Sequence, residues 1–217
     1  MIVADSSSLI SLAMNCLCPV FDYLDKHVAV TPRVYGEVVT KPLSGRRFRY
    51  EAYRIKNLFD SQILSVEEVD AKRVNEIMDM SNSIYSVSGK KLKIIHPAEA
   101  EAFVLCEQKK ASAFLIDERT MRLLLEDPDT LRNVLEHRNH KKVSADQKAL
   151  KRFQNRVSRV PILRSTEILA LAYEHGFFPK HVGYTEKKVF LAAVSALKLS
   201  GCAITWDEVE EYDRLVI

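Results

Sequence analysis

The chain has 217 residues, of which 47% are hydrophobic and 28% are charged, and its formal net charge is +3. This composition excludes an intrinsically disordered chain, and the length allows a core to form without disulfides or structural metals. No apolar run approaches the length of a membrane span, and Asp5 interrupts the apolar N-terminus, so we expect neither a membrane segment nor a signal peptide. The four cysteines are therefore expected to be reduced thiols of a cytoplasmic protein.

Short apolar runs alternate with helical patterns along the chain. Strands are predicted at residues 1–5, 27–30, 63–66, 113–117 and 160–163. Helices are predicted at residues 9–17, 31–40, 46–60, 67–85, 98–110 and 166–175. The alternation predicts an α/β fold with a Rossmann-like parallel sheet flanked by helices. We expect one domain over 1–217, with a basic helical insertion at 127–160 and the C-terminal part of the domain at 161–217.

Acidic residues stand at the ends of several predicted elements. Asp5 and Asp117 each follow an apolar run, Glu37 lies in the second helix, and Glu99 and Glu101 lie near the start of the helix at 98–110. Taken singly, each acid can be explained as a helix cap or an exposed residue. Gathered at one edge of a parallel sheet, they would repel one another unless a cation lay among them. Mg²⁺ and Mn²⁺ take such oxygen ligands.

Four motifs in chain order resemble those of PIN domains. They are Asp5-Ser6-Ser7-Ser8-Leu9, Thr31-Pro32-x-Val34-x-x-Glu37-Val38, Ala98-Glu99-Ala100-Glu101-Ala102 and Phe114-Leu115-Ile116-Asp117-Glu118-Arg119. The resemblance covers roughly residues 1–125, and weaker similarity through 162–179 and 191–212 resembles a prokaryotic, VapC-like subfamily of archaeal type. Two positions depart from the family pattern: Ala98 replaces a glycine, and Leu115 stands where many members carry Thr or Ser.

The resemblance implies an enzyme that uses Mg²⁺ or Mn²⁺ to hydrolyse phosphodiester bonds of single-stranded RNA. It also implies products with 5′-phosphate and 3′-hydroxyl ends, a homodimer, and either an RNA-processing enzyme or a toxin with an acidic antitoxin-like partner. The catalytic and metal-binding acids carried over by motif are Asp5, Glu37, Glu101 and Asp117. Glu101 is preferred to Glu99 because residues two apart on a helix point in different directions, and Glu101 shares the apolar side of its helix.

Substrate-binding residues are expected at three places. The Ser7 hydroxyl is expected near the metal or the phosphate, and Arg119 either contacts phosphate or pairs with an acid. Segment 132–164, which includes Lys141 and Lys142, has ten Lys and Arg residues against two acids. This charge is typical of a phosphate-binding surface, but a solvated basic face or a face for an acidic antitoxin is the alternative.

The third place is the cluster Arg46, Arg47 and Arg49, which alternates with Phe48 and Tyr50. Basic and aromatic residues together suit single-stranded RNA, because bases stack on rings while guanidinium groups meet phosphates. The alternative is an amphipathic helix whose aromatic residues pack into the core or against a dimer partner. For the whole chain, the second hypothesis is a PIN-like scaffold that binds RNA or protein with little or no catalysis. Missing acids would favour the scaffold, and none is missing.

Overall fold

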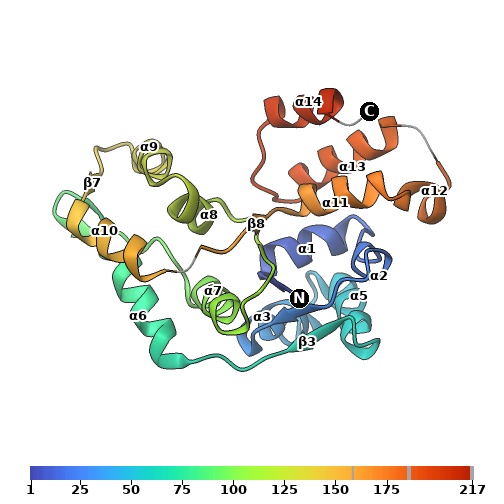
Figure 1. The fold of residues 1–217 in the computed structure, drawn as a ribbon, viewed down its shortest axis with the longest axis horizontal. Helices are drawn as coiled ribbons and strands as arrows, with labels where there is room; N and C mark the ends of the chain where they lie inside the picture. Colours follow the sequence, from blue (N-terminus) through green and yellow to red (C-terminus); the bar gives the residue numbers. More distant parts are fainter. Residues whose placement is uncertain (158, 185–186, 216–217) are drawn as a thin grey trace.

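The computed structural model describes residues 1–157, 159–184 and 187–215 and contains a five-stranded parallel sheet covered by helices on both faces (Figure 1). Residue 158 of the predicted insertion and residues 185–186 and 216–217 of the predicted C-terminal part lie outside the described residues. The sheet order is β3-β2-β1-β6-β8. Its strands are β1 (Ile2–Ala4), β2 (Val28–Val30), β3 (Leu64–Val66), β6 (Ala113–Leu115) and β8 (Ile162–Leu163).

Helices form most of the chain. Before β6 they are α1 (Ser6–Met14), α2 (Val20–Tyr23), α3 (Pro32–Tyr35), the π-helical segment η1 (Gly36–Thr40), α4 (Lys41–Ser44), α5 (Arg49–Asp60), α6 (Ala71–Ser81) and α7 (Pro97–Lys109). After β6 they are α8 (Arg119–Glu126), α9 (Pro128–Asn139), α10 (Gln147–Arg156), α11 (Ser165–Glu174), α12 (Phe177–His181), α13 (Lys187–Leu199) and α14 (Trp206–Leu215). Within the described ranges, no helix has the length and apolar character needed to cross a membrane.

The strands are short and apolar, and their residues alternate between two cores. Ile2 and Ala4 of β1 face the core formed with α1, α11 and α13, while Val3 faces the core formed with α6, α7 and α8. All three side chains are at most 5% exposed. β1, β2 and β6 are buried on both faces, and such strands form continuous apolar runs in the sequence, as predicted. The edge strands β3 and β8 are only partly buried, and they too lie where the sequence predicts them.

The predicted helix at 67–85 is wrong at both ends. Helix α6 begins only after Asp70, whose carboxylate accepts hydrogen bonds from the backbone N–H groups of Lys72 and Arg73. It ends at Ser81, and the chain then forms a hairpin of β4 (Tyr85–Val87) and β5 (Lys90–Lys91). Ser88 and Gly89 both have positive φ, as a tight two-residue hairpin turn requires.

The predicted end of the second helix is also wrong, because the helical backbone continues past Thr40 to Ser44. Pro42 lacks the N–H group that an α-helix interior needs. The wider turn of η1 lies directly before it, where the hydrogen-bond register changes, and the helix therefore passes through this proline.

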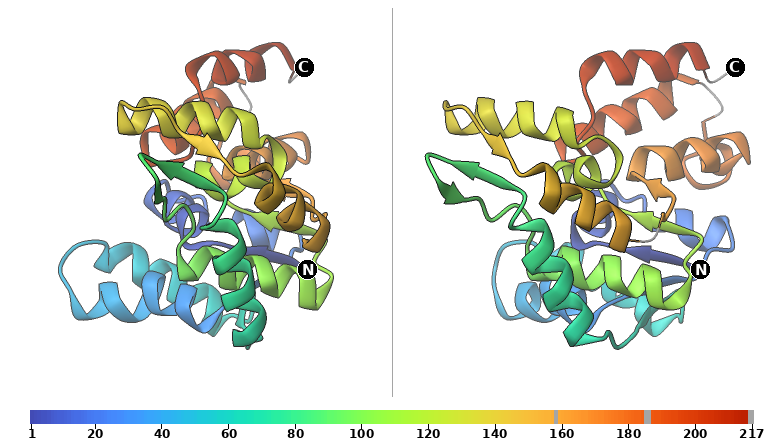
Figure 2. Two further views of the ribbon diagram at one scale, coloured as in Figure 1. Left: turned by 90° about the vertical axis from the view of Figure 1, so that its left-hand side faces the viewer. Right: turned by 60° about the vertical axis from the view of Figure 1, so that its left-hand side comes forward.

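The predicted insertion packs against the rest of the domain through apolar side chains of its helices. Leu131 and Leu135 of α9 and Leu150 and Phe153 of α10 are buried in the core that α6 and α7 share. Strand β7 (Ser144–Ala145) pairs antiparallel with β4, so a small sheet of order β5-β4-β7 joins the insertion to the hairpin. In the left view of Figure 2, this sheet and the α4–α5 region project toward the same side.

Candidate carboxylate site

Asp5 is the buried acid at the carboxyl end of the central strand. It caps α1, and its Oδ2 accepts hydrogen bonds from the Ser7 backbone N–H at 3.1 Å and from the Ser7 hydroxyl at 2.8 Å. Burial, which exceeds the opposing effect of these bonds, raises the pKa of the Asp5 carboxyl above its usual value. An acid held this way is fixed in orientation but costly to ionise without a nearby cation.

Ser6, which is not among the predicted site residues, lies between the carboxylates of Glu37 and Asp5. The Ser6 hydroxyl donates to Oε2 of Glu37 at 2.6 Å, and it lies 3.5 Å from Oδ1 of Asp5. Ser6 is buried at the first residue of α1, while Glu37 reaches it from η1. The structure therefore brings together two of the four predicted acids, Asp5 and Glu37.

Glu99 joins these acids, whereas Glu101 is held in an ion pair. Oε1 of Glu101 lies 2.8 Å from Nε of Arg33, one helical turn before Glu37. Burial, together with the charges of Glu118, Asp5 and Glu37, raises the pKa of Glu99 to about 8. Both acids of α7 therefore lie near Glu37, Glu101 in an ion pair with Arg33 and Glu99 without one in the described part of the chain, and the preference for Glu101 over Glu99 stays a prediction.

Asp117 is buried and bonded to a different helix. Its Oδ1 accepts a hydrogen bond from the Ser165 backbone N–H at 2.7 Å, and its Oδ2 accepts one from the Ser165 hydroxyl, also at 2.7 Å. Burial raises the pKa of Asp117 against the effect of these hydrogen bonds, and the charge of Glu167 also raises it. Both oxygens of Asp117 are thus engaged by the start of α11, while its backbone N–H donates to the Ser7 hydroxyl that also bonds Asp5; its role as a metal-site acid stays a prediction.

Glu118, which is not among the predicted site residues, lies near Glu99. It caps α8, and its Oε2 accepts hydrogen bonds from the backbone N–H groups of Thr120 at 2.6 Å and Met121 at 3.0 Å. It is the strongest charged influence on Glu99. We call Asp5, Glu37, Glu99 and Glu118 the acidic site. The sequence signal that could have indicated Glu118 is its position directly after Asp117, at the end of the strand.

The predicted substrate-binding residues fall into two groups. The Ser7 hydroxyl already donates to Asp5 and accepts from the backbone N–H of Asp117 at 3.2 Å, so it orients the site acid. Arg119 is exposed on the first residue of α8. The other predicted side chains are exposed and make no ion pair within the described part of the chain; they are Arg46, Arg47, Arg49, Lys141 and Lys142.

Two of the ten basic residues in segment 132–164 are neutralised by acids. Arg156 pairs with Glu76 at 2.6 Å, and Arg164 pairs with Glu167 and Glu208, each at 2.6 Å. These two arginines therefore hold helices together. The prediction of a phosphate-binding surface stays open for the exposed, unpaired members of the segment.

The donors of the acidic site are all oxygens, which is the ligand set that Mg²⁺ and Mn²⁺ prefer. Asp5 and Glu99 both have raised pKa values, so the site favours a positive charge. As the side chains stand, no three His, Cys, Asp or Glu residues in the described ranges are arranged around one cation position. The chemistry of the donors fits a hard dication, and binding would require these side chains to converge.

Comparison with known proteins gives one match. The sequence model of a PIN-domain family matches residues 1–174, from the first strand through the end of α11. Neither the curated proteins nor the solved structures gave a match to the chain. The matched residues include every member of the acidic site, and the parallel sheet agrees with the family's fold. The chain belongs to the PIN-domain family.

Proposed function

We propose that the protein is a Mg²⁺- or Mn²⁺-dependent endoribonuclease that hydrolyses phosphodiester bonds of single-stranded RNA. PIN domains are generally nucleases, which supports hydrolysis of a nucleic acid in the coarse sense. The observation that carries the proposal is the pair of carboxylates of Asp5 and Glu37, with the Ser6 hydroxyl between them, at the carboxyl edge of the sheet. Ligands of open α/β sheets bind at this edge.

The chain's own residues would prepare this edge for a charged substrate. Ser6 and Ser7 hold the carboxylates of Glu37 and Asp5 in place, and Glu118 is fixed by the first turn of α8. Bound there, a divalent ion would lower the pKa of water and neutralise charge on the phosphate. His96 is the N-cap of α7, which supports a structural role rather than that of a general base.

The test is cleavage of a fluorescently labelled single-stranded RNA by purified protein. We expect cleavage with Mn²⁺ or Mg²⁺, none with EDTA, and a loss of at least about 100-fold in Asp5→Asn. Cleavage that survives both EDTA and Asp5→Asn would refute the proposal. Cleavage of DNA but not RNA would support a nuclease and refute RNA as its substrate.

The alternative function is a PIN-like scaffold that binds RNA or protein with little catalysis. It is favoured by the bonding of Asp117 to Ser165, which engages both oxygens of one predicted metal-site acid. RNA binding without cleavage under any divalent ion would support it. The proposal includes a homodimer, which light scattering tests. It also includes a toxin role with an acidic antitoxin-like partner, which co-purification with the product of a neighbouring gene tests.

A further inference from the structure

A cavity of about 220 Å³ lies beside the acidic site, between the starts of α7 and α8 and the end of α9. One part of its wall is acidic and consists of Glu99 and Glu118. Another part is basic and polar and consists of Lys93, Arg138 and Asn139. The cavity therefore presents both signs of charge, and the predicted insertion supplies the Arg138 side.

A row of lysines continues from this cavity along the small sheet. Val87 pairs with Lys90 in the hairpin, and Tyr85 pairs with Ala145 in the antiparallel β4–β7 ladder. The hairpin turn and the residues just before β7 therefore lie at the same end of the sheet. This register brings Lys90 and Lys91 together with Lys141 and Lys142, and we call these four residues the lysine ridge.

None of the basic residues of the cavity or the lysine ridge is neutralised within the described part of the chain. Lys93 and Arg138 are exposed and make no ion pair or side-chain hydrogen bond there, and the same holds for the four lysines. Arg156 of the insertion, in contrast, pairs with Glu76. Lys151 and Arg152 of α10 are also exposed and unpaired in the described part of the chain, but no residue of α10 lines the cavity.

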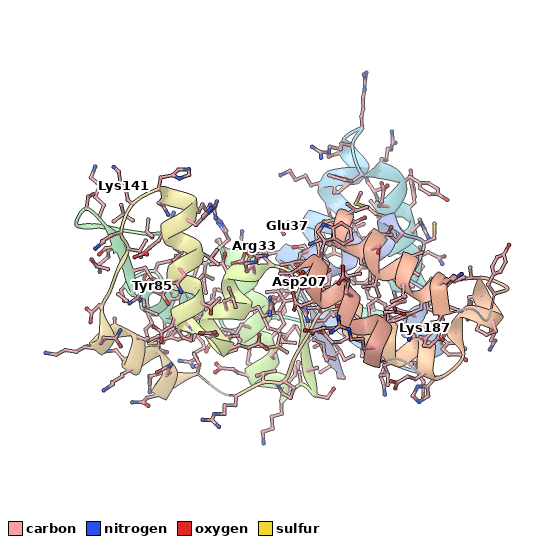
Figure 3. All side chains as sticks on the ribbon, turned by 90° about the horizontal axis from the view of Figure 1, so that it is seen from above. Arg33, Glu37, Tyr85, Lys141, Lys187 and Asp207 are labelled. Atoms are coloured by element: carbon pink, nitrogen blue, oxygen red, sulfur yellow. The ribbon has the colours of Figure 1, made fainter. Side chains whose placement is uncertain are left out.

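The position of the ridge agrees with a path to the acidic site. Figure 3 shows Lys141 at the outer end of the arm formed by α9 and the hairpin, with Glu37 and Arg33 at its inner end. The helix α10 lies on the other side of this arm from Lys141. A chain molecule crossing the ridge would thus reach the acids after passing the cavity.

We propose that this cavity binds the nucleotide next to the scissile phosphate, with Lys93 and Arg138 contacting its phosphate, and that the lysine ridge binds the continuing RNA strand. This inference rests on the proposed nuclease function and adds the path of its substrate. An acidic protein would meet repulsion from Glu99 and Glu118 in the cavity. A polynucleotide that enters with a cation complements both charges of the cavity. The cation lies against Glu99 and Glu118, while the phosphates lie against Lys93 and Arg138.

The experiment measures binding without cleavage. All variants are made in an Asp5→Asn background with Mg²⁺, and affinity for a short unstructured fluorescein-labelled RNA is measured by fluorescence polarisation at several salt concentrations. Lys93→Gln/Arg138→Gln tests the cavity, and Lys141→Gln/Lys142→Gln tests the ridge. Lys151→Gln/Arg152→Gln on α10 is the control, because it removes the same charge as the cavity pair from exposed positions on the other side of the arm.

We expect the cavity and ridge pairs each to weaken binding about tenfold and to lower the salt slope by about 0.7 per lost phosphate contact, with a change below about twofold in the control. Equal losses of RNA affinity in all three pairs would mean that only the net charge of the protein matters, and this would overturn the inference. So would unchanged binding in the cavity and ridge pairs, or displacement of the RNA by polyglutamate as readily as by unlabelled RNA.

Cleavage is then measured with the same pairs in the wild-type background. A raised KM with little change in kcat in the cavity and ridge pairs is expected from lost substrate binding. Full cleavage with an unchanged KM would overturn the substrate path and leave the nuclease proposal standing. Absence of cleavage in the wild-type protein, with ridge-dependent RNA binding, would instead refute the nuclease proposal and retain the binding surface.

Discussion

Asp117 and Ser165 form two hydrogen bonds across the carboxyl edge of the sheet, both at 2.7 Å, although 48 residues separate them. Ser165 is the first residue of α11, so Asp117 satisfies a backbone N–H that the helix itself cannot. Through these bonds the end of β6 fixes the start of a helix that follows β8. The first prediction concerns this contact.

Asp117→Ala is expected to lower the free energy of unfolding by about 2–3 kcal/mol, because it leaves the buried N–H of Ser165 without a partner. Asp117→Asn keeps the shape of the side chain and allows it to accept one hydrogen bond from Ser165 and donate one to it. We therefore expect the free energy of unfolding to fall by less than about 1 kcal/mol. Urea unfolding compares the two variants. Equal and small losses in both would contradict a role in fixing α11.

Glu99→Gln and Glu101→Gln are expected to separate the two acids of α7. Glu99→Gln removes a carboxylate of the acidic site and should reduce RNA cleavage by at least about 100-fold. Glu101→Gln removes a partly exposed ion pair with Arg33 and should change stability by less than about 1 kcal/mol and cleavage by less than about tenfold. The cleavage rates of both variants are compared at saturating Mn²⁺. The reverse order would support Glu101 as the site acid.

The pH dependence of stability in EDTA follows from the raised pKa of Glu99. Because this pKa is about 8 in the folded protein and near 4.5 in the unfolded chain, the folded state holds an extra proton between these pH values. Stability is therefore expected to fall as pH rises through this window. At pH 8.5, Glu99→Gln should be more stable than wild type by roughly 1–3 kcal/mol. The Tm measured across the window checks this, and saturating Mg²⁺ should reduce the difference.

The opposite dependence is expected for Glu208. Although partial burial opposes its ionisation, hydrogen bonds from Thr205 and Arg164 lower the pKa of Glu208 to about 2. Its contribution is present above about pH 4.5 and is lost as pH falls toward 2. Glu208→Gln should therefore destabilise the protein by about 1 kcal/mol at pH 7, after allowance for solvent screening, and the difference from wild type should shrink in acid. A difference independent of pH would contradict the pairing with Arg164.

The sequence predicted the central sheet because its strands are apolar runs too short to be confused with helices. It missed the hairpin at Tyr85 because the hydrophobic spacing of α6 continues into β4 and only Ser88 and Gly89 signal the turn. Asp5 and Glu37 could be predicted because their positions follow from local element ends. The contacts of Glu101 and Asp117 depend on Arg33 and Ser165, which lie 68 and 48 residues away, and no local pattern specifies such contacts.

The match to the family ends at residue 174, yet the helices beyond it are built into the domain. Phe177, Phe178 and Phe190 are at most 1% exposed and lie in the same core as β1 and α1, and Ser200 accepts a hydrogen bond from Asn15. A chain shortened to the matched segment would therefore expose apolar surface on α11 that these helices cover. We therefore expect a fragment that ends at residue 174 to aggregate. Shortened forms of this protein need to keep the helices after residue 174.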